Sequence, residues 1–519
     1  MIIDARSISA NETIETDVCI VGAGTAGITL ARAFIGQPFR VCLLESGGLE
    51  PDQETQSLYQ GENAGLPYYP LDTARARYLG GSSNRWHIEL GGDRLGVRLR
   101  PLDPIDFAGR DWVPYSGWPF DKTHLDPFYD RAQAVCRIEP VTYDVKAWEN
   151  PEKRPRLPFV GNRMETVIFK FGTRDLFTKE YCSQVKSAEN ITTYLHANAV
   201  EVETDEAARV VNRLQVACLQ GNRFSVSARL FILALGGIET PRLLLLSRQR
   251  QSTGLGNQHD LVGRFFMEHL HFWSGIYLPP RPDFFRSTAL YNTIHTVQQV
   301  PIIGKLALTE PVLRREKLLS QNVQLIPSLM SNTFLYPPLP SQDPVSVVRN
   351  AYRRVRRVTG RLLNRQGIRV FQLANMTEQI PNPNSRVTLS HEQDRLGQNR
   401  VQLDWQITPL DIRSAIRTQE IMGEELQRAG LGRLYIQLRD ETPPPGLHGG
   451  YHHMGTTRMH NDPKQGVVDA DSRVHGTANL YVAGPSVFPT GGYANPVLTI
   501  VALALRLADH VKMRMKEGA

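Results

Sequence analysis

The feature that most constrains the fold of this 519-residue chain is a glycine-rich turn between two apolar runs near its start. The first run, 17–21, is followed by a helical pattern of apolar residues over 28–35, and the second run, 40–44, ends in Glu45. The glycines of the turn have the spacing G-x-G-x-x-G and are Gly22, Gly24 and Gly27. Strand, glycine turn, helix and strand in this order predict a βαβ unit that binds a dinucleotide, and hence an α/β fold.

Each residue of this unit has a physical role in the predicted site. Gly22 permits the tight turn, Gly24 lets the backbone approach a pyrophosphate, and Gly27 lets the helix pack closely on the strand. The helix N-terminus offers unpaired N–H groups and a positive dipole end to the phosphates. Glu45, 23 positions after Gly22, can accept hydrogen bonds from ribose hydroxyls. The unit leaves NAD and FAD both open, and an ordinary βα turn is the alternative.

Two distant segments repeat the pattern of a buried strand followed by glycine. The apolar run 229–235 leads into two glycines and a helical pattern, and the run 479–483 leads into Gly484 and, further on, an apolar helix over 497–513. Such units are typical of one sheet with crossover helices, so we expect three separated stretches to form one cofactor domain. That domain is predicted from 1–100, 186–270 and 441–519, and a second, substrate domain from 101–185 and 271–440.

The step Asn495-Pro496 marks the start of the C-terminal helix. Asn is a favoured N-cap and Pro suits the first helical position, so this pair predicts a helix start by itself. A buried helix start also directs partial positive charge outward, which would suit the negative charge of a reduced cofactor. The structural and the functional interpretations are compatible.

The net charge of +7 comes from one segment. Residues 344–366 hold seven arginines, from Arg349 to Arg365, and no acidic residue, which leaves equal numbers of basic and acidic residues elsewhere. Apolar residues recur with helical spacing over 347–363, so we expect a helix whose arginines face solvent or a subunit contact. An acidic electron-acceptor partner, an anionic membrane surface and a mobile cover are the alternatives. Nucleic acid is disfavoured because the rest of the chain adds no basic excess.

Other function classes are disfavoured by what the sequence lacks. The five cysteines are widely spaced and form no C-x-x-C pair, and no H-E-x-x-H frame is present, so we expect neither a disulfide scaffold nor a metal site. No G-x-S-x-G elbow follows a strand, which argues against a serine hydrolase. Residues 1–17 hold no apolar segment of signal-peptide length, and the apolar stretch 496–505 is too short to span a bilayer. We therefore expect a soluble, cytoplasmic protein with no transmembrane segment.

Further motifs follow one another along the chain in a fixed order. They are Tyr78-Leu-Gly80-Gly81-Ser-Ser-Asn84-Arg-Trp86-His, Ala197-Asn-Ala-Val200, Leu261-Val-Gly263-Arg-Phe-Phe-Met267-Glu-His269, Glu378-Gln-Ile-Pro-Asn-Pro-Asn-Ser385-Arg-Val387, Tyr451-His452-His453-Met454-Gly455-Thr456, Val467-Val-Asp469 and Asn495-Pro-Val-Leu-Thr499. With the N-terminal fingerprint, they resemble the glucose–methanol–choline (GMC) oxidoreductase family. The resemblance implies FAD as the cofactor and an α/β fold. It also implies a doubly wound, Rossmann-like FAD-binding domain and a substrate domain with a mostly antiparallel sheet and helices.

Within that family the chain is most similar to the branch of pyranose oxidases and glycoside 3-oxidases. The final pair is His452 plus Asn495, as in that branch, and the segment 115–120 is similar to one in bacterial sugar-oxidising relatives. Arg85 stands where some pyranose oxidases tether FAD through a histidine, so we expect noncovalent FAD. The resemblance further implies contacts with FAD from Gly80, Gly81, Asn84, Trp86, His87, Val200, Ala234, Gly484, Asn495 and Pro496.

The resemblance assigns the catalytic base to His452. Neutral imidazole is a natural proton acceptor near pH 7, and Asn495 would hold the same hydroxyl and aim its carbon at flavin N5. His453 and His460 are the competing candidates. Neighbouring residues of an extended segment point to opposite faces, so we expect His453 to be packed elsewhere. His87 matches a neighbour of flavin N5 that would tune oxygen reactivity or contact substrate, or would merely lie near the ring.

The sequence thus predicts FAD-dependent oxidation of a secondary alcohol, at C2 or C3 of a pyranose sugar or glycoside, by hydride transfer to flavin N5. Oxygen or a quinone is the expected electron acceptor. The alternatives are a sugar or alcohol dehydrogenase that passes electrons to a quinone or protein, a flavin-containing hydroxynitrile lyase, and a noncatalytic flavin-binding scaffold. The expected partners are the sugar or glycoside and, at the Arg349–Arg365 helix, a second copy of the chain or an acidic protein.

Overall fold

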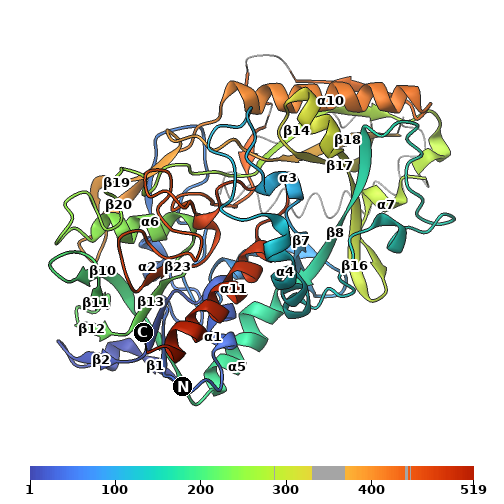
Figure 1. The fold of residues 1–519 in the computed structure, drawn as a ribbon. Coiled ribbons are helices and arrows are strands. Elements are labelled where there is room, and N and C mark those ends of the chain that lie inside the picture. The colour runs from blue at the N-terminus through green and yellow to red at the C-terminus, as the bar shows by residue number, and fades with distance from the viewer. Residues whose placement is uncertain (286, 330–368, 439–441, 445, 519) are drawn as a thin grey trace.

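The chain folds around one parallel and one antiparallel sheet, which lie at opposite ends of the view in Figure 1. This computed structural model describes residues 1–285, 287–329, 369–438, 442–444 and 446–518. The arginine-rich helix predicted within 344–366 lies outside the described residues. The two kinds of sheet confirm the predicted fold class, an α/β architecture with a parallel cofactor sheet and a mostly antiparallel second sheet.

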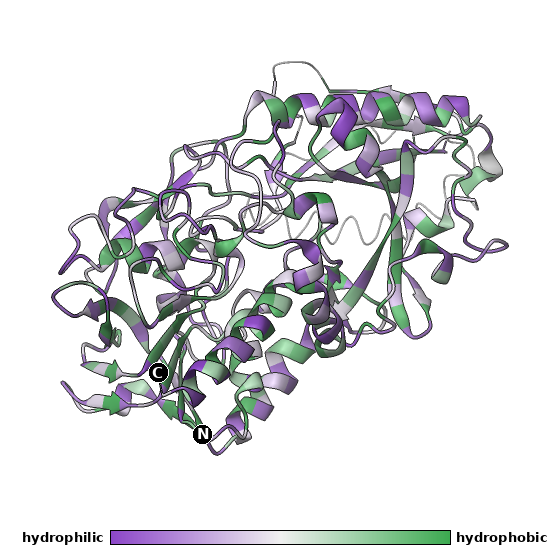
Figure 2. Cartoon of the chain, viewed as in Figure 1, coloured by the Kyte–Doolittle hydropathy of each residue, from purple (hydrophilic) through white to green (hydrophobic). Residues whose placement is uncertain are grey.

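The parallel sheet has six strands, and all its neighbouring pairs run in the same direction. From edge to edge they are β1 (Ile2–Asp4), β9 (Ile191–Leu195), β4 (Val41–Leu44), β3 (Val18–Val21), β13 (Leu230–Leu233) and β23 (Leu480–Val482). Each residue of β3, β4 and β13 is buried, as expected for strands covered on both faces. Figure 2 shows hydrophobic residues concentrated along these strands. Strands are therefore confirmed within the predicted runs 17–21, 40–44, 229–235 and 479–483.

Three helices pack together beside this sheet. α11 (Val497–Lys516) lies against α1 (Thr25–Ala33) on one side and against α4 (Lys122–Cys136) on the other. Both predicted helices in the sheet's crossovers are confirmed, because α1 follows β3 and α6 (Gly236–Leu246) follows β13. The start of α11 at Val497 also agrees with the sequence.

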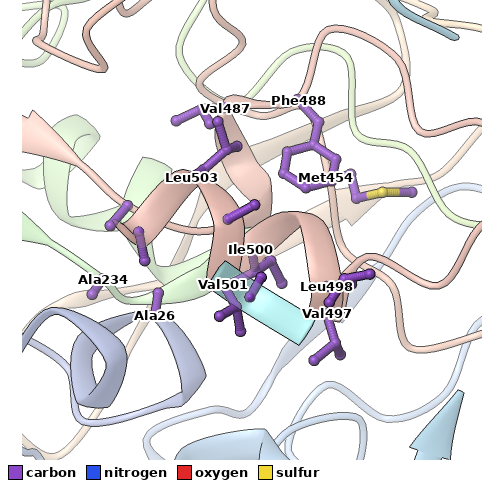
Figure 3. Packing of buried hydrophobic residues seen from close by; sticks show 14 of the residues in the cluster. Ala26, Ala234, Met454, Val487, Phe488, Val497, Leu498, Ile500, Val501 and Leu503 are labelled. Carbon is purple, nitrogen blue, oxygen red and sulfur yellow. The ribbon is translucent and has the colours of Figure 1, made fainter. Parts of the chain in front are cut away.

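The first turns of α11 are buried between sheet and loops. Figure 3 shows Leu498 and Val501 of α11 in a cluster with Met454, Val487 and Phe488. Leu498 and Phe488 have no exposed surface. The packing anchors the helix start, and with it residues 495 and 496, against the segment around Met454.

Replacing Leu498 with alanine is expected to lower the free energy of unfolding by about 2–5 kcal/mol, because the apolar contacts are lost and a cavity remains. The shift in the urea midpoint of unfolding measures this loss. Met513→Ala is the matched control on the same helix; its side chain is 56% exposed, and its effect is expected to stay within about 0.5 kcal/mol. Equal shifts for both variants would contradict the predicted packing.

The antiparallel sheet has ten strands, and each of its pairs runs in opposite directions. Its main path is β21 (Arg433–Ile436), β14 (Leu270–Leu278), β18 (Arg369–Thr377), β17 (Gln321–Leu329), β16 (Val300–Leu308), β8 (Met164–Thr173), β7 (Leu95–Leu99) and β6 (Ile88–Glu89), with β15 (His295–Val297) on β16 and β22 (His448–Gly449) on β14. Strands β6, β7 and β22 come from ranges that the sequence assigns to the cofactor domain. The domain boundaries stay a prediction.

Two smaller sheets and several helices complete the described structure. The first sheet contains β10 (Asn198–Thr204), β11 (Val211–Ala217), β12 (Arg223–Ser227) and β2 (Thr13–Glu15), and the second contains β19 (Arg386–Gln393), β20 (Asn399–Asp404) and β5 (Gly61–Asn63). The other helices are α2 (Gln53–Ser57), α3 (Pro104–Phe107), α5 (Tyr181–Ser187), α7 (Ala289–Asn292), α8 (Glu310–Glu316) and α10 (Pro409–Arg428). α10 packs on β21 at the edge of the antiparallel sheet.

The described residues were also compared with the expectations about membrane segments, disulfides and metal sites. None of their helices has the length and apolar character needed to cross a membrane. The five cysteines are all buried, and they form no disulfide with one another. Within the same ranges, no three His, Cys, Asp or Glu side chains are grouped so that they could hold a metal ion.

Candidate functional site

A cavity of about 720 Å³ joins the carboxyl ends of the parallel strands to the face of the antiparallel sheet. The ends of β3, β4, β13 and β23 all contribute to its wall, which is where ligands bind in open α/β sheets. Most site residues predicted from the sequence line this cavity: Gly22, Gly24, Glu45, Gly81, Trp86, His87, Val200, Ala234, His452, Gly484, Asn495 and Pro496. The structure thus brings together residues that are up to 474 positions apart.

Three predicted contact residues lie behind the cavity wall instead. A Cβ on Gly27 would overlap the Gly22 carbonyl oxygen, so Gly27 allows the close approach of helix and turn. Gly80 has φ +91°, which favours glycine, and Asn84 Nδ2 donates to the Gly81 carbonyl at 3.0 Å. These residues shape the two loops that form the cavity without lining it.

The glycine turn before α1 fits a pyrophosphate. Gly22 has φ +103°, and a Cβ there would lie 2.7 Å from the Ala234 carbonyl oxygen. Gly24 and Gly81 face each other so closely that a Cβ on Gly81 would lie 2.9 Å from the Gly24 Cα. α1 begins directly after Gly24, so its N-terminal N–H groups are available at the cavity.

Glu45 fits the ribose end of the same ligand. Its carboxylate accepts hydrogen bonds from the backbone amides of Ala23, at 3.0 Å, and Gly47, at 2.9 Å. Burial raises the pKa of Glu45, and these two amides oppose the shift. Each carboxylate oxygen has a further lone pair, so the group can also accept hydrogen bonds from a ribose diol. Turn and carboxylate together match a dinucleotide with its pyrophosphate on α1.

His452 and Asn495 meet at the opposite end of the cavity. Asn495 Nδ2 lies 3.1 Å from His452 Nε2, and both residues line the cavity. The expectation that Asn495 caps α11 is wrong: the N-cap position is Pro496, and no side chain caps the helix. The amide of Asn495 is instead committed to His452, while its Oδ1 is buried and finds no partner among the described residues.

A chain of hydrogen bonds fixes which nitrogen of His452 carries its proton. His269 Nε2 lies 2.8 Å from the Gly492 carbonyl oxygen, which can only accept, so Nε2 carries the proton of His269. Its Nδ1 is then a lone pair, and His452 Nδ1, 2.8 Å away, must donate to it. His452 Nε2 is left as the acceptor for Asn495 Nδ2. His269 therefore holds His452 with its basic nitrogen toward the cavity.

The imidazoles of His269 and His452 are both neutral near pH 7. Burial lowers the pKa of His269 to about 4. Burial lowers the pKa of His452 well below its usual value, and the nearby imidazoles of His269 and His453 and the charge of Arg98 add to the shift. A neutral His452 with a lone pair on Nε2 can accept a proton from a hydroxyl group in the cavity.

Glu268 holds the loop that carries His452. Its Oε2 accepts hydrogen bonds from the backbone amides of Gly450, at 3.0 Å, and His452, at 2.9 Å, and its Oε1 accepts one from Tyr68. The same Tyr68 hydroxyl lies 2.8 Å from His453 Nε2, and His453 stacks on Phe266. The two adjacent histidines thus have separate partners: His452 bonds to Asn495 and His269, and His453 bonds to Tyr68.

The remaining predicted histidines differ in place. His87 lines the cavity, and its Nδ1 lies 3.1 Å from the Arg85 carbonyl oxygen. His460 is outside the cavity wall, and its Nδ1 accepts a hydrogen bond from the backbone of Asp462. Sequence reasoning gave no role to Glu268 or His269, although both lie in the motif that ends at residue 269.

Three comparisons with known proteins show what the chain is similar to. Residues 381–504 match the family model described as GMC oxidoreductase. The chain is 25% identical to the fructose dehydrogenase large subunit of Gluconobacter japonicus, across 98% of this chain and 100% of that protein. A C-glycoside 3-oxidase from Arthrobacter globiformis is 35% identical over 118 residues, which are 22% of this chain and 20% of that protein. Formate oxidase of Aspergillus oryzae shares the fold, with a TM-score of 0.56, 17% identity, and coverage of 98% of this chain and 100% of that chain.

Fold and site define a flavin-dependent oxidoreductase: a dinucleotide cradle on a parallel sheet opens toward a paired histidine and asparagine. Residues 381–504 are similar to the GMC oxidoreductase family, and FAD is the cofactor that this similarity and the cradle imply. The glycine turn, the start of α1 and Glu45 are the residues that would hold FAD.

Proposed function

We propose that this chain oxidises a secondary alcohol at C2 or C3 of a pyranose sugar or glycoside. The main support for this proposal is the pair of His452 Nε2 and Asn495 Nδ2, which lie 3.1 Å apart in the wall of the cavity. The names of the relatives support a sugar-like alcohol, since one acts on fructose and one on C-glycosides at position 3. The similarity to the C-glycoside 3-oxidase is local, and that to the fructose dehydrogenase runs through the whole chain.

Oxidation of an alcohol removes a hydride from carbon and a proton from oxygen. Bound FAD supplies the acceptor for the hydride. The substrate hydroxyl replaces Asn495 Nδ2 as the donor to His452 Nε2. Nε2 then accepts the hydroxyl proton, because the bond to His269 keeps the other nitrogen protonated. Asn495 Nδ2 donates to the substrate oxygen and orients the carbon that loses the hydride, which can supply several kcal/mol of barrier lowering.

An anaerobic screen of sugars and glycosides tests this proposal. Loss of the visible absorbance of oxidised flavin on mixing is the expected result. A hydroxynitrile lyase or a noncatalytic scaffold would leave the flavin oxidised with every sugar. An absence of bleaching across the screen would overturn the proposal.

The electron acceptor separates an oxidase from a dehydrogenase. Full-length similarity to a dehydrogenase large subunit favours transfer to a quinone or a protein as the second candidate. Exposing the reduced enzyme to air and measuring peroxide distinguishes the two, because an oxidase reoxidises rapidly with stoichiometric peroxide. Slow reoxidation in air combined with fast reoxidation by a soluble quinone would identify a dehydrogenase.

We expect FAD to be released intact when the protein is denatured in acid. Arg85 replaces the histidine that could form a covalent link, and a guanidinium is no nucleophile toward the flavin ring. Precipitation followed by absorbance of the supernatant measures the release. Flavin that stays with the pellet, together with a peptide carrying the flavin mass, would show a covalent link at another residue such as His87.

A further inference from the structure

Arg98 is a cation in the cavity wall that pairs with no acidic side chain of the described residues. It lies on β7 and lines the same cavity as His452 and Asn495. Its Nη2 donates to Gln324 Oε1 at 3.3 Å, and its Nε has no hydrogen-bond partner in the described structure. No carboxylate of the described residues forms an ion pair with it. A guanidinium keeps its charge near pH 7. The positive charge of Arg98 is therefore not compensated by any described side chain.

Three other arginines of the cavity wall have carboxylate partners, whereas Arg85 is exposed and donates to the Arg75 carbonyl oxygen. Arg75 and Arg77 pair with Glu239 at 2.6 and 3.3 Å, and Arg242 pairs with Asp394 at 2.7 Å. These charges hold the pKa of Glu239 down to about 2 against the effect of burial. Burial is the one cause acting on Arg98, and it lowers the pKa of Arg98 to about 10. Arg98 therefore differs from Arg75, Arg77 and Arg242, because no carboxylate of the described residues pairs with it.

The surroundings of Arg98 add polarity without adding negative charge. Lys305 is buried on β16, which β8 separates from β7, and it donates to Asn322 Oδ1 at 2.7 Å. Burial, followed by the charge of Arg98, lowers the pKa of Lys305 well below its usual value. His271 also lines the cavity, and its Nε2 finds no partner in the described structure. The cavity wall thus presents the Arg98 guanidinium and the unpartnered Nε2 of His271 to whatever binds there.

We propose that Arg98 binds a carboxylate of the substrate, so that the substrate is an acidic sugar such as a uronic acid or a glycoside of one. The inference rests on the proposed oxidation of a sugar alcohol. A guanidinium binds a carboxylate through two parallel N–H···O bonds, which fixes orientation as well as contributing affinity. Arg98 would then hold one end of the sugar ring while His452 and Asn495 address a hydroxyl at the other.

The test compares uronic acids with neutral partners of the same shape. The FAD-loaded enzyme is mixed anaerobically with glucuronate, galacturonate, their methyl esters and the parent hexoses, and the rate of flavin bleaching is measured against concentration. At least one free uronate is expected to give a kcat/KM about 10–100-fold above its ester, as for a hydrogen bond between charged groups.

Two variants and one control separate this role from others. Arg98→Gln is expected to bring the acid-to-ester ratio close to one, and Arg98→Lys to restore part of the preference. Arg94→Gln changes an exposed arginine of the same hairpin, whose guanidinium contacts backbone carbonyls, and is expected to keep the wild-type ratio.

Three results would overturn the inference. Neutral hexoses that bleach the flavin at least as well as the uronates would reject the acidic substrate and leave the proposed oxidation intact. An unchanged ratio in Arg98→Gln with an altered flavin reduction potential would assign Arg98 to the reduced cofactor instead. A flavin that no sugar bleaches would reject both the inference and the proposed function.

Discussion

Alanine at position 452 is expected to slow the reduction of FAD by substrate by about 10²–10⁴-fold, the usual contribution of a general base. The imidazole is the group that takes the hydroxyl proton, and Asn495 carries no lone pair on the nitrogen that faces it. His452→Ala should still bind FAD, because the cradle of Gly22, Gly24 and Glu45 lies at the other end of the cavity. Anaerobic stopped-flow absorbance measures the rate, and the flavin-to-protein ratio measures occupancy.

His460→Ala is the matched control, since His460 is the rival candidate and lies outside the cavity wall. Its rate of flavin reduction should equal that of the wild type. The pH profile adds an independent check. Burial lowers the pKa of His452, so the base stays unprotonated as the pH falls, and the acid limb of the wild-type rate should lie below 6.5. A wild-type rate in His452→Ala would mean that another group accepts the proton.

Replacing His269 with leucine is expected to lower the rate of flavin reduction by about 10²–10⁴-fold, although His269 accepts no proton itself. Without an acceptor at His269 Nδ1, His452 loses the bond that keeps its proton on Nδ1. The proton can then move to Nε2, which removes the lone pair from the cavity. His269 is thus a positioning residue.

His269→Asn provides the conservative partner for this experiment. The Oδ1 of asparagine occupies about the place of imidazole Nδ1 and can accept the same hydrogen bond, so this variant should retain most of the rate. A merely structural role for His269 would predict equal losses in both variants. The ¹⁵N chemical shifts of His452 would report its tautomer directly, and an Nε2-protonated His452 in the wild type would contradict the assignment.

The sequence predicted those parts of the molecule that follow local rules. The buried strands, the glycine turn and the helix after Pro496 depend on short-range patterns, and all lie where predicted. The cap on α11 was wrong because a tertiary contact, the bond from Asn495 to His452, replaced a local one. The helix-capping propensity of asparagine carries no information about a distant side chain that competes for its amide.

The role of His269 could not be predicted for a similar reason. It depends on four atoms contributed by residues 269, 452 and 492, and on which of the two nitrogens each ring presents. The unpaired charge of Arg98 could not be predicted from the sequence either. Sequence composition counts an arginine, but the missing counter-charge is evident only when the neighbours of its side chain are known.

The order of the parallel strands has a consequence for how the chain matures on the ribosome. β3 pairs with β13, which is synthesised much later, and β13 pairs with β23 at positions 480–482, which is synthesised later still. Both His452 and Asn495 also follow β3 and β13 in the order of synthesis. A nascent chain that has not reached residue 480 therefore has an open sheet edge at β13, so the parallel sheet that carries the cavity is completed late in synthesis.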